Sequence, residues 1–252
     1  MERSSLGDRM KGYELASKTC LPRRLPIIVR LDGAHFHTYT RGLDKPFDDK
    51  LIVAMNQTAI ELCSQIQGAQ LAFTQSDEVS ILIHNYKHLN SGSWHDNAVQ
   101  KMVSVAAGIA SSTMTKESSE VFGQIKPAVF DARIFVVPEA EVCNYFVWRQ
   151  KDQQRNSIQM VARSIYSDKQ CYKKNKEDLK LMIINAGQDW GLLHNHYKYG
   201  RCIVKTKYER NDQIRTKWKV QATTPIFQDN PSYINDLLKV LPEQSAENII
   251  RA

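Results

Sequence analysis

The sequence predicts an α+β fold whose first half contains strands and helices in a fixed alternation. An apolar run at 25–31 predicts a buried strand, and residues 48–67 carry apolar side chains near the helical period. Two further apolar runs, 70–74 and 79–84, lie on either side of a short polar turn. Such a pair predicts a β-hairpin. The first half of the chain is therefore predicted to begin strand, helix, strand, strand.

A second helix and a fourth strand complete this unit. Residues 97–114 are rich in Ala, Ser and Val, and residues 128–136 form another apolar run. The predicted order is then β-α-β-β-α-β, the split βαβ arrangement of ferredoxin-like folds. A short amphipathic helix is expected before this unit, at 6–17. The elements expected after it are a long helix to about 166, a helix at 176–186, strands at 201–206 and 217–223, and a tail helix at 231–241.

Length and composition fit a globular protein. The chain has 252 residues, of which 42% are hydrophobic and 24% charged, enough to bury a large core. We expect a core at 1–137, followed at 138–252 by an α/β C-terminal elaboration.

The sequence also bears on the cellular setting. No apolar run approaches the roughly 20 residues that span a bilayer, and the N-terminus lacks the apolar core of a secretory signal. The five cysteines are scattered and form no CxxC pair, which argues against a zinc site or a disulfide framework. We expect an intracellular, cytoplasmic protein without membrane contact, while a mitochondrial location stays open.

Charge points to an anionic partner. Thirty-four basic residues against twenty-seven acidic ones give a net charge of +7, and many basic residues gather in the second half with aromatic residues between them. A solvated surface would explain this composition equally well. Phosphate contacts with a nucleic acid become the better explanation if the first half carries a metal site.

Three carboxylates suggest such a metal site. Asp32 follows the first strand, and Asp77 and Glu78 lie in the hairpin turn. If the sheet brings these strand ends together, three carboxylates meet at one point, and bound divalent metal would offset their repulsion. Two Mg²⁺ ions about 4 Å apart catalyse nucleotidyl transfer in many enzymes. Asp-Gly and Ser-Asp-Glu are also common turn sequences, so neither motif is specific alone.

The residues after Asp32 suit a phosphate-binding loop. Gly33 permits a sharp turn and a close approach to a ligand, and the backbone amides of residues 33–37 could surround a triphosphate. Glu78 alternates in direction with Asp77 in a regular strand. It could therefore reach the second metal or orient a neighbouring side chain.

Several blocks together resemble the tRNA-histidine guanylyltransferase superfamily, in family order from residue 6 to about 206. They are Leu6-Gly7-Asp8-Arg9-Met10-Lys11, Arg30-Leu31-Asp32-Gly33, Lys45-Pro46-Phe47-Asp48, Thr74-Gln75-Ser76-Asp77-Glu78, Phe130-Asp131-Ala132-Arg133, Trp148-Arg149-Gln150 and Arg155-Asn156-Ser157. The catalytic domain of that family is similar to the palm of polymerases and nucleotidyl cyclases. Its members add nucleotides to the 5′ end of RNA.

The resemblance implies roles for individual residues. Asp32, Asp77 and Glu78 match residues needed for catalysis, and Asp32, Asp77 and the Gly33 carbonyl match magnesium ligands. The implied nucleotide-binding residues are Asp32, Gly33, Ala34, His35, Phe36, His37, Lys45, Ser76 and Asp77. Arg30 and Lys101 are expected near triphosphates. Arg133, Arg155, Asn156 and Ser157 are expected to bind tRNA.

The resemblance also implies substrates and assembly. ATP would activate a 5′-monophosphate end, and GTP or another NTP would then be added, with two Mg²⁺ ions per active site. We expect tRNA as the polynucleotide partner and a homotetramer as the assembly. The palm-like catalytic core would be 1–137, and the C-terminal elaboration at 138–252 would contact tRNA and form the oligomer.

One block indicates the branch of the family. Gln154-Arg155-Asn156-Ser157-Ile158 stands where eukaryotic histidine-tRNA guanylyltransferases carry His-Ile-Asn-Asn. This pattern is similar to the "-like" branch of template-dependent 3′–5′ polymerases that repair truncated tRNA 5′ ends. Ala34 replaces a polar residue found in many members, which weakens any inference about purine selection.

Three alternatives stay open. Dedicated addition of the extra guanosine to histidine tRNA is the nearest one. A palm-type nucleotidyl cyclase would not need the basic second half, and a non-catalytic tRNA-binding protein would not need Asp32 and Asp77. The pair His194 and His196 is expected to be polar surface rather than a metal site. For Trp148 we expect a structural role.

Overall fold

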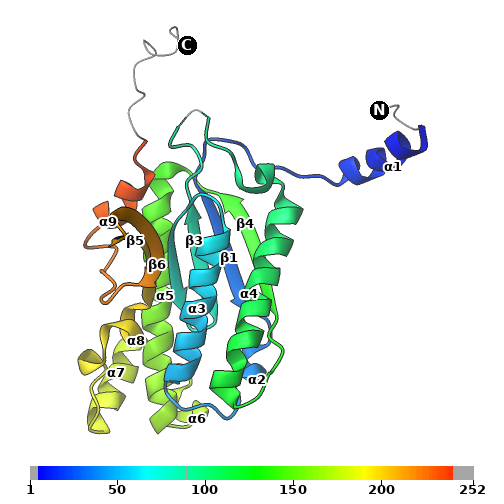
Figure 1. Ribbon diagram of the computed structural model, residues 1–252. Coiled ribbons are helices and arrows are strands. Elements are labelled where there is room, and N and C mark those ends of the chain that lie inside the picture. Colours follow the sequence, from blue (N-terminus) through cyan, green and yellow to red (C-terminus); the bar gives the residue numbers. More distant parts are fainter. Residues whose placement is uncertain (1–4, 89, 241–252) are drawn as a thin grey trace.

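The computed structural model describes residues 5–88 and 90–240 (Figure 1). In this part of the chain the centre is a six-stranded antiparallel sheet in the order β4-β1-β3-β2-β5-β6. The strands are β1 (Ile27–Gly33), β2 (Ala69–Gln75), β3 (Glu78–Ile83), β4 (Phe130–Val136), β5 (Arg201–Arg210) and β6 (Gln213–Val220).

Helices surround this sheet. The longer ones are α1 (Ser5–Ala16), α3 (Asp49–Gln65), α4 (Val99–Phe122), α5 (Glu139–Ile165) and α7 (Lys176–Asn185). The short ones are α2 (Phe36–Tyr39), α6 (Asp168–Cys171), α8 (Asn195–Tyr199) and α9 (Ser232–Asn235), with 3₁₀ turns at Trp94–Asn97, Trp190–Leu192 and Asp236–Leu238.

The predicted β-α-β-β-α-β order is confirmed. Its four strands lie in the spatial order β4-β1-β3-β2, each antiparallel to its neighbour, and α3 and α4 lie side by side on one face (Figure 1). The Asp48 side chain caps α3 by accepting a hydrogen bond of 2.9 Å from the Leu51 amide. β5 then adds to the outer edge of β2, so the strands of the C-terminal segment extend the same sheet.

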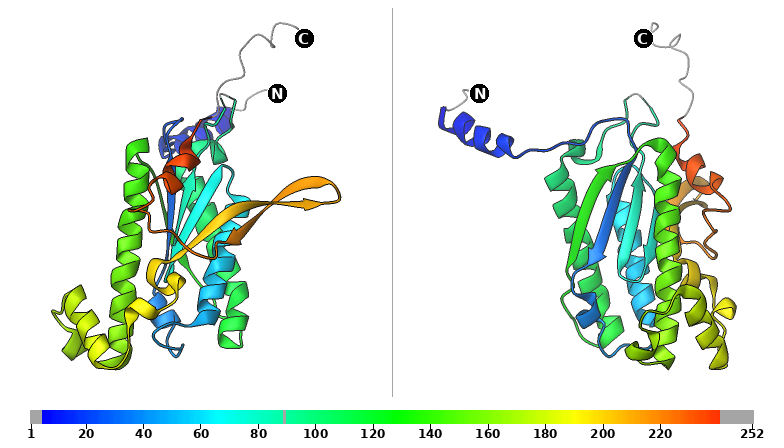
Figure 2. Two further views of the ribbon diagram at one scale, coloured as in Figure 1. Left: turned by 90° about the vertical axis from the view of Figure 1, so that its left-hand side faces the viewer. Right: turned by 180° about the vertical axis from the view of Figure 1, so that it is seen from behind.

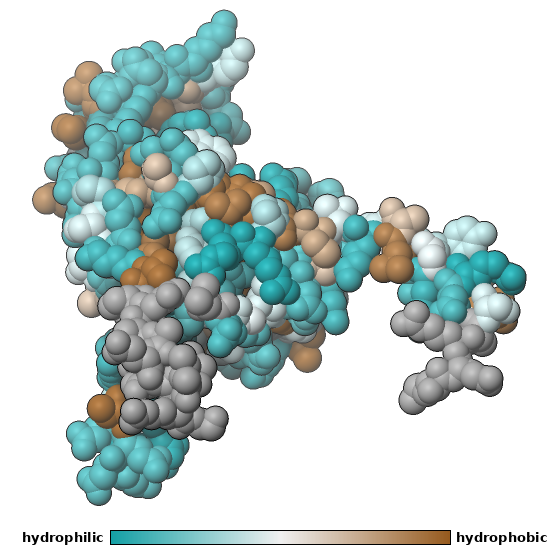
Figure 3. Space-filling model, turned by 90° about the horizontal axis from the view of Figure 1, so that it is seen from above, coloured by the Kyte–Doolittle hydropathy of each residue, from teal (hydrophilic) through white to brown (hydrophobic). Residues whose placement is uncertain are grey.

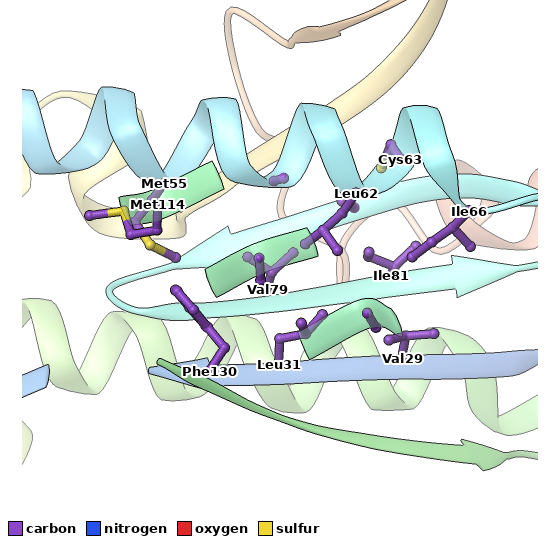
Figure 4. Close-up of a cluster of buried hydrophobic side chains, with 14 of the residues drawn as sticks. Val29, Leu31, Met55, Leu62, Cys63, Ile66, Val79, Ile81, Met114 and Phe130 are labelled. Atoms are coloured by element: carbon purple, nitrogen blue, oxygen red, sulfur yellow. The ribbon is translucent and has the colours of Figure 1, made fainter. Parts of the chain in front are cut away.

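Alternation along the strands divides the sheet into two faces. Val29, Leu31, Val79 and Ile81 face α3 and α4, and they pack with residues such as Met55 (Figure 4). Because successive side chains point to opposite faces, their neighbours Ile28, Arg30 and Asp32 lie on the other side. That second face is covered by α5 over only part of its width, and none of the described helices lies over β1 and β4 there (Figure 2, right).

The C-terminal segment builds two further features. The second half of α5 packs against α7 through a small apolar cluster, which contains Ile158, Val161, Leu179, Ile183 and Trp190. β5 and β6 form a hairpin whose tip extends away from the body (Figure 2, left). The hairpin carries much of the basic charge of the second half, and Lys205 lies 4.9 Å from the Trp218 ring centroid.

Several boundaries differ from the sequence prediction. Helix α1 forms as expected, but it extends away from the body and buries none of its side chains (Figure 1). Helix α4 continues to Phe122 instead of ending at 114. The hairpin strands extend to Arg210 and begin at Gln213, because Asn211 and Asp212, both with positive φ, make the tight turn.

The tail and the surface complete the description. The tail helix expected at 231–241 is instead a short helix and a 3₁₀ turn that end at Leu238, and residue 241 lies outside the described residues. Seen from above, the surface is largely hydrophilic (Figure 3). None of the described helices combines the length and the apolar character that crossing a membrane requires.

Candidate active site

Asp32 and Asp77 lie together where β1 ends. In the sheet register Asp32 is opposite Glu78 on β3 and Asp131 on β4. The amide of Gly33 donates a hydrogen bond of 3.1 Å to the carbonyl of Asp77 in the β2–β3 turn. The end of β1 and the hairpin turn therefore meet, although 45 residues of chain separate Asp32 from Asp77.

Gly33 is required by the close packing after Asp32. A Cβ atom at this position would lie 2.3 Å from Cδ2 of Phe36, far inside van der Waals contact. The Phe36 ring is buried and stacks on Tyr39 with 4.6 Å between centroids. Phe36, predicted to bind nucleotide, thus supports the loop from inside.

Fewer backbone amides of residues 33–37 are free to bind phosphate than the sequence suggests. The Gly33 amide is bonded to Asp77, and the Ala34 amide donates to the carbonyl of Val129 at 2.9 Å. The amides available for phosphate narrow to residues 35–37, at the start of α2, where helix geometry leaves amides without intrahelical acceptors. The imidazoles of His35 and His37 are exposed beside them, as is Ser76 in the hairpin turn.

The two aspartates carry an electrostatic penalty. Burial raises the pKa of Asp32, and the charges of Asp77 and Glu78 raise it further, while Arg30 opposes them. Burial is also the main cause of the raised pKa of Asp77, which the hydrogen bond from Ser76 partly offsets. Two partly buried carboxylates that resist ionisation together fit a divalent cation, since its charge removes the penalty. Oxygen donors of this kind are those Mg²⁺ prefers.

Glu78 does not join them. Its Oε1 accepts from Nε of Arg149 at 2.7 Å, and its Oε2 lies 2.5 Å from Nη2 of Arg149 and 2.9 Å from Nη2 of Arg30. Among the described residues no group of three His, Cys, Asp or Glu side chains could hold a metal. The expected convergence of three carboxylates is therefore wrong, because Glu78 is turned toward the two arginines.

Arg30 connects Glu78 to the aspartate pair. Its Nη2 lies 3.4 Å from Oδ2 of Asp32, and its guanidinium carbon lies 5.8 Å from the Trp148 ring centroid. Arg30 thus stands beside the aspartate pair, and its contact with a triphosphate stays a prediction. Its donors are already directed at carboxylates in this structure.

Helix α5 supplies residues that sequence reasoning missed. Arg149 is buried and also pairs with Asp152 at 2.8 Å. The Tyr145 hydroxyl lies 2.8 Å from the Ser80 hydroxyl, beside Glu78, and burial raises the pKa of Tyr145 to about 12. The only signal for Arg149 was its place in the Trp148-Arg149-Gln150 block, since Glu78 lies 71 residues away in sequence.

The two predicted lysines lie at different ends of the sheet. Lys45 is exposed in the segment between α2 and α3, at the end where β1 finishes (Figure 1). Lys101 lies in the first turn of α4, which is bonded through the Val99 amide to the carbonyl of Thr19, ahead of β1. Within one chain, Lys101 is therefore remote from Asp32.

The residues predicted to bind tRNA differ in their exposure. Arg133 on β4 and Arg155 on α5 are exposed, and each pairs with a nearby aspartate, Asp131 and Asp152. Asn156 is half-buried. Ser157 is fully buried, and its hydroxyl accepts a hydrogen bond of 2.9 Å from Nε1 of Trp190. Direct contact between Ser157 and RNA is thus ruled out in this conformation.

The chain is similar to proteins of one family. Residues 7–138 match the family profile described as "Thg1: tRNAHis guanylyltransferase". A solved "Bacterial tRNA(HIS) Guanylyltransferase (Thg1)-Like Protein in complex with ATP" shares 42% identity and a TM-score of 0.88, covering 94% of this chain and 100% of that one. The corresponding structure in complex with GTP shares 41% identity and a TM-score of 0.79, covering 93% and 99%.

Two curated relatives match different lengths of this chain. The uncharacterized protein R259 of Acanthamoeba polyphaga mimivirus is 28% identical over 261 residues, which covers 94% of this chain and 88% of that protein. The "Probable tRNA(His) guanylyltransferase" of Dictyostelium discoideum is 31% identical over 138 residues, and the match spans only 52% of either protein.

Proposed function

Because the chain belongs to the tRNAHis guanylyltransferase family, in its Thg1-like branch, we propose that it extends tRNA 5′ ends in the 3′–5′ direction under a template. It is a nucleotidyltransferase of that family. The proposed task is repair of truncated 5′ ends. The opposing strand of the acceptor stem would select each added nucleotide.

The single observation that carries the proposal is the aspartate pair at the end of β1. Asp32 and Asp77 have raised pKa values from burial, so they favour a divalent cation over two bare charges. We propose that both carboxylates, with the Gly33 carbonyl, hold two Mg²⁺ ions. Bound there, Mg²⁺ would activate the attacking hydroxyl and neutralise the triphosphate and leaving group.

Nucleotide binding is proposed at the same end of the sheet. The similar bacterial proteins were solved in complex with ATP and with GTP. The amides of residues 35–37, the exposed Lys45 and the Ser76 hydroxyl would contact the phosphates. Arg30 is held between Asp32 and Glu78 and would turn from Asp32 toward a bound triphosphate.

The proposed chemistry has two balanced steps. An oxygen of the RNA 5′-monophosphate attacks the α-phosphorus of ATP, and pyrophosphate leaves. The 3′-hydroxyl of an incoming NTP then attacks the 5′-phosphorus of the adenylylated end, losing its proton as AMP leaves. RNA that already carries a 5′-triphosphate skips the first step and releases pyrophosphate in the second.

Glu78 has an indirect role in this proposal. Its carboxylate accepts from Arg30 and Arg149 and lies beside the Ser80 hydroxyl, 3.2 Å away. It would therefore hold Arg30 at the site, within reach of a bound triphosphate, rather than hold metal. The requirement for Glu78 would then arise from positioning.

The polynucleotide would lie on the uncovered face of β1 and β4 and along α5. Arg133 and Arg155 are exposed there, and phosphate contacts of this kind dominate affinity. The protruding basic hairpin β5–β6 offers a second contact surface. We further propose a palm-like core at 1–137, the C-terminal elaboration at 138–252 and a homotetramer.

Two observations favour repair over the alternatives. The two bacterial structures at 42% and 41% identity are Thg1-like proteins, and Gln154–Ile158 lacks the His-Ile-Asn-Asn pattern. Dedicated guanosine addition to histidine tRNA remains the second candidate, since the matched profile carries that name. A cyclase is disfavoured by the same family membership.

The test is extension of a tRNA that lacks its first nucleotide and carries a 5′-triphosphate, with Mg²⁺ and all four NTPs. Repair predicts addition of the nucleotide complementary to the opposing base, and a change of that base should change the nucleotide added. Addition of guanosine whatever the opposing base, with preference for histidine tRNA, would support the second candidate. No extension by the wild type would refute both.

A further inference from the structure

Trp148 is an exposed aromatic side chain beside the aspartate pair. It lies on α5 and is 53% exposed, whereas Trp94 and Trp190 are 5% and 8% exposed. The structural role expected for it from the sequence does not account for this exposure. Single exposed apolar residues are common, so the surroundings of the indole decide whether this one has a use.

Those surroundings belong to the active site. The guanidinium carbon of Arg149 lies 4.4 Å from the Trp148 ring centroid, and that of Arg30 lies 5.8 Å from it. Arg30 in turn lies 3.4 Å from Asp32. One side chain therefore separates the indole from the proposed metal ligands, on the face of β1 to which Arg30 and Asp32 belong.

Three neighbouring side chains contact the indole. Arg30 and Arg149 both approach the same Oε2 atom of Glu78, at 2.9 and 2.5 Å, so their guanidinium groups lie close to each other beside the ring. Tyr145 contacts its edge with 5.9 Å between centroids. These contacts orient the ring, while more than half of the side chain faces solvent.

We infer that the exposed surface of the Trp148 indole stacks on a nucleobase presented at the aspartate pair. A flat aromatic surface accepts any base by stacking, which suits an enzyme whose base choice comes from a template. The cations beside the indole fix its orientation without contacting the base. This inference rests on the proposed function for the identity of the substrate but not for the stacking itself.

The base has two sources with the same chemistry. It belongs to the nucleoside triphosphate or to the terminal pair of the acceptor stem. Stacking is worth about 1–3 kcal/mol per base, which corresponds to a loss of roughly 5- to 150-fold in affinity when the ring is removed.

Two substitutions separate stacking from packing. Trp148→Phe keeps an aromatic face, and Trp148→Leu keeps apolar bulk over the arginines but no ring. Stacking predicts that Trp148→Leu loses about 5- to 150-fold in kcat/KM for extension, while Trp148→Phe loses only a few-fold. Leu181→Ala, a change at a 60% exposed apolar residue on α7, is the control and should leave extension unchanged. Equal loss in the Leu and Phe variants, with equal loss of thermal stability, would overturn the inference.

A binding measurement tests the same point without activity. Tryptophan fluorescence of the full chain is titrated with GTP, with a short 5′-triphosphate RNA stem, and with inorganic tripolyphosphate as a ligand without a base. Stacking predicts quenching by GTP or by the stem that is absent in Trp148→Phe, and no such quenching by tripolyphosphate. The ligand that quenches the fluorescence, GTP or the RNA stem, identifies the source of the base.

The outcomes separate the two proposals. Quenching without extension would refute the proposed function and retain the stacking site. Extension with unchanged kinetics in Trp148→Leu, or quenching that is equal in wild type and Trp148→Phe, would refute the stacking site and retain the function.

Discussion

The two faces of β1 have opposite character. On one face Val29 and Leu31 are fully buried against α3 and α4. On the other, Arg30 and Asp32 belong to a partly open row of charges with Glu78 and Asp131 opposite Asp32. A single strand thus contributes stability through alternate residues and chemistry through those between them. Changes on the first face should alter folding, and changes on the second should alter activity.

The largest expected effect is loss of catalysis in Asp77→Asn. Without one carboxylate the metal site loses several kcal/mol of transition-state stabilisation, on the order of 10³-fold in rate or more. Extension of a 5′-triphosphate RNA should fall by this factor, while RNA binding in a filter or gel assay stays near wild type. Asp131→Asn, a change at an exposed carboxylate opposite Asp32 in the register, is the control and should retain most activity. Turnover near wild type in Asp77→Asn would remove Asp77 from the metal site.

Glu78→Gln should damage both folding and activity. It leaves the buried Arg149 without its main partner and releases Arg30, and breaking one side of a buried ion pair costs about 3–5 kcal/mol. The free energy of unfolding in urea should fall by that amount. Because the penalty comes from the unpaired charge, the double variant Glu78→Gln/Arg149→Met should lose much less than the two single losses added together. Additive losses would show that the two side chains are not coupled.

Leu31→Ala should change folding alone. Removing a fully buried leucine side chain costs about 2–5 kcal/mol, which a urea or thermal unfolding curve would measure. At a temperature where the variant is fully folded, kcat should match the wild type, since Leu31 faces α3 and α4. A fall in kcat as large as that of Glu78→Gln would show that the two faces are not separable.

The raised pKa values of Asp32 and Asp77 predict two pH effects. Protons compete with Mg²⁺ for the carboxylates. As the pH is lowered, the Mg²⁺ affinity of the site should therefore begin to fall at a higher pH than for aspartates with ordinary pKa values. The fall should reach up to about tenfold per pH unit for each of the two aspartates. Without metal, the native state carries a free-energy penalty above the raised pKa, and this penalty disappears as the pH falls toward the ordinary aspartate pKa of 3.8. Asp77→Asn lacks this penalty and should melt above the wild type at neutral pH. A lower melting temperature would contradict the raised pKa.

The smallest effects should separate Arg133 from Ser157. Arg133→Ala should weaken RNA binding a few-fold and reduce the slope of log K against log salt concentration by about 0.7–0.9.

Ser157→Ala leaves the buried indole N–H of Trp190 without its acceptor, which costs about 1–3 kcal/mol of stability. RNA affinity should not change in that variant. A salt-dependent loss of RNA binding in Ser157→Ala would restore it as a contact residue.

The contrast between the faces also explains which features the sequence predicts. Alternation in β1 and helical periodicity in α3 are local patterns, so the split βαβ order was predictable. The hairpin β5–β6 has exposed side chains on both faces near its tip. Its length therefore had no apolar pattern to mark it.

Site residues were predictable only where each one belongs to a local sequence motif at the end of a predicted strand. Asp32 and Asp77 follow from strand ends that must meet. The pairing of Glu78 with Arg149 depends on how α5 packs across the sheet, and no local pattern encodes that packing. Ser157 was misplaced for the same reason, because its burial depends on Trp190, 33 residues later in the chain.

Metal binding at the end of β1 is the most direct test of this account. Bound Mn²⁺, a paramagnetic substitute for Mg²⁺, would be counted by electron paramagnetic resonance with a non-hydrolysable GTP analogue, in wild type, Asp32→Asn and Asp131→Asn. We predict two ions per site in the wild type and in Asp131→Asn, with loss of at least one in Asp32→Asn. Wild-type stoichiometry and affinity in Asp32→Asn would contradict the assignment of the aspartate pair.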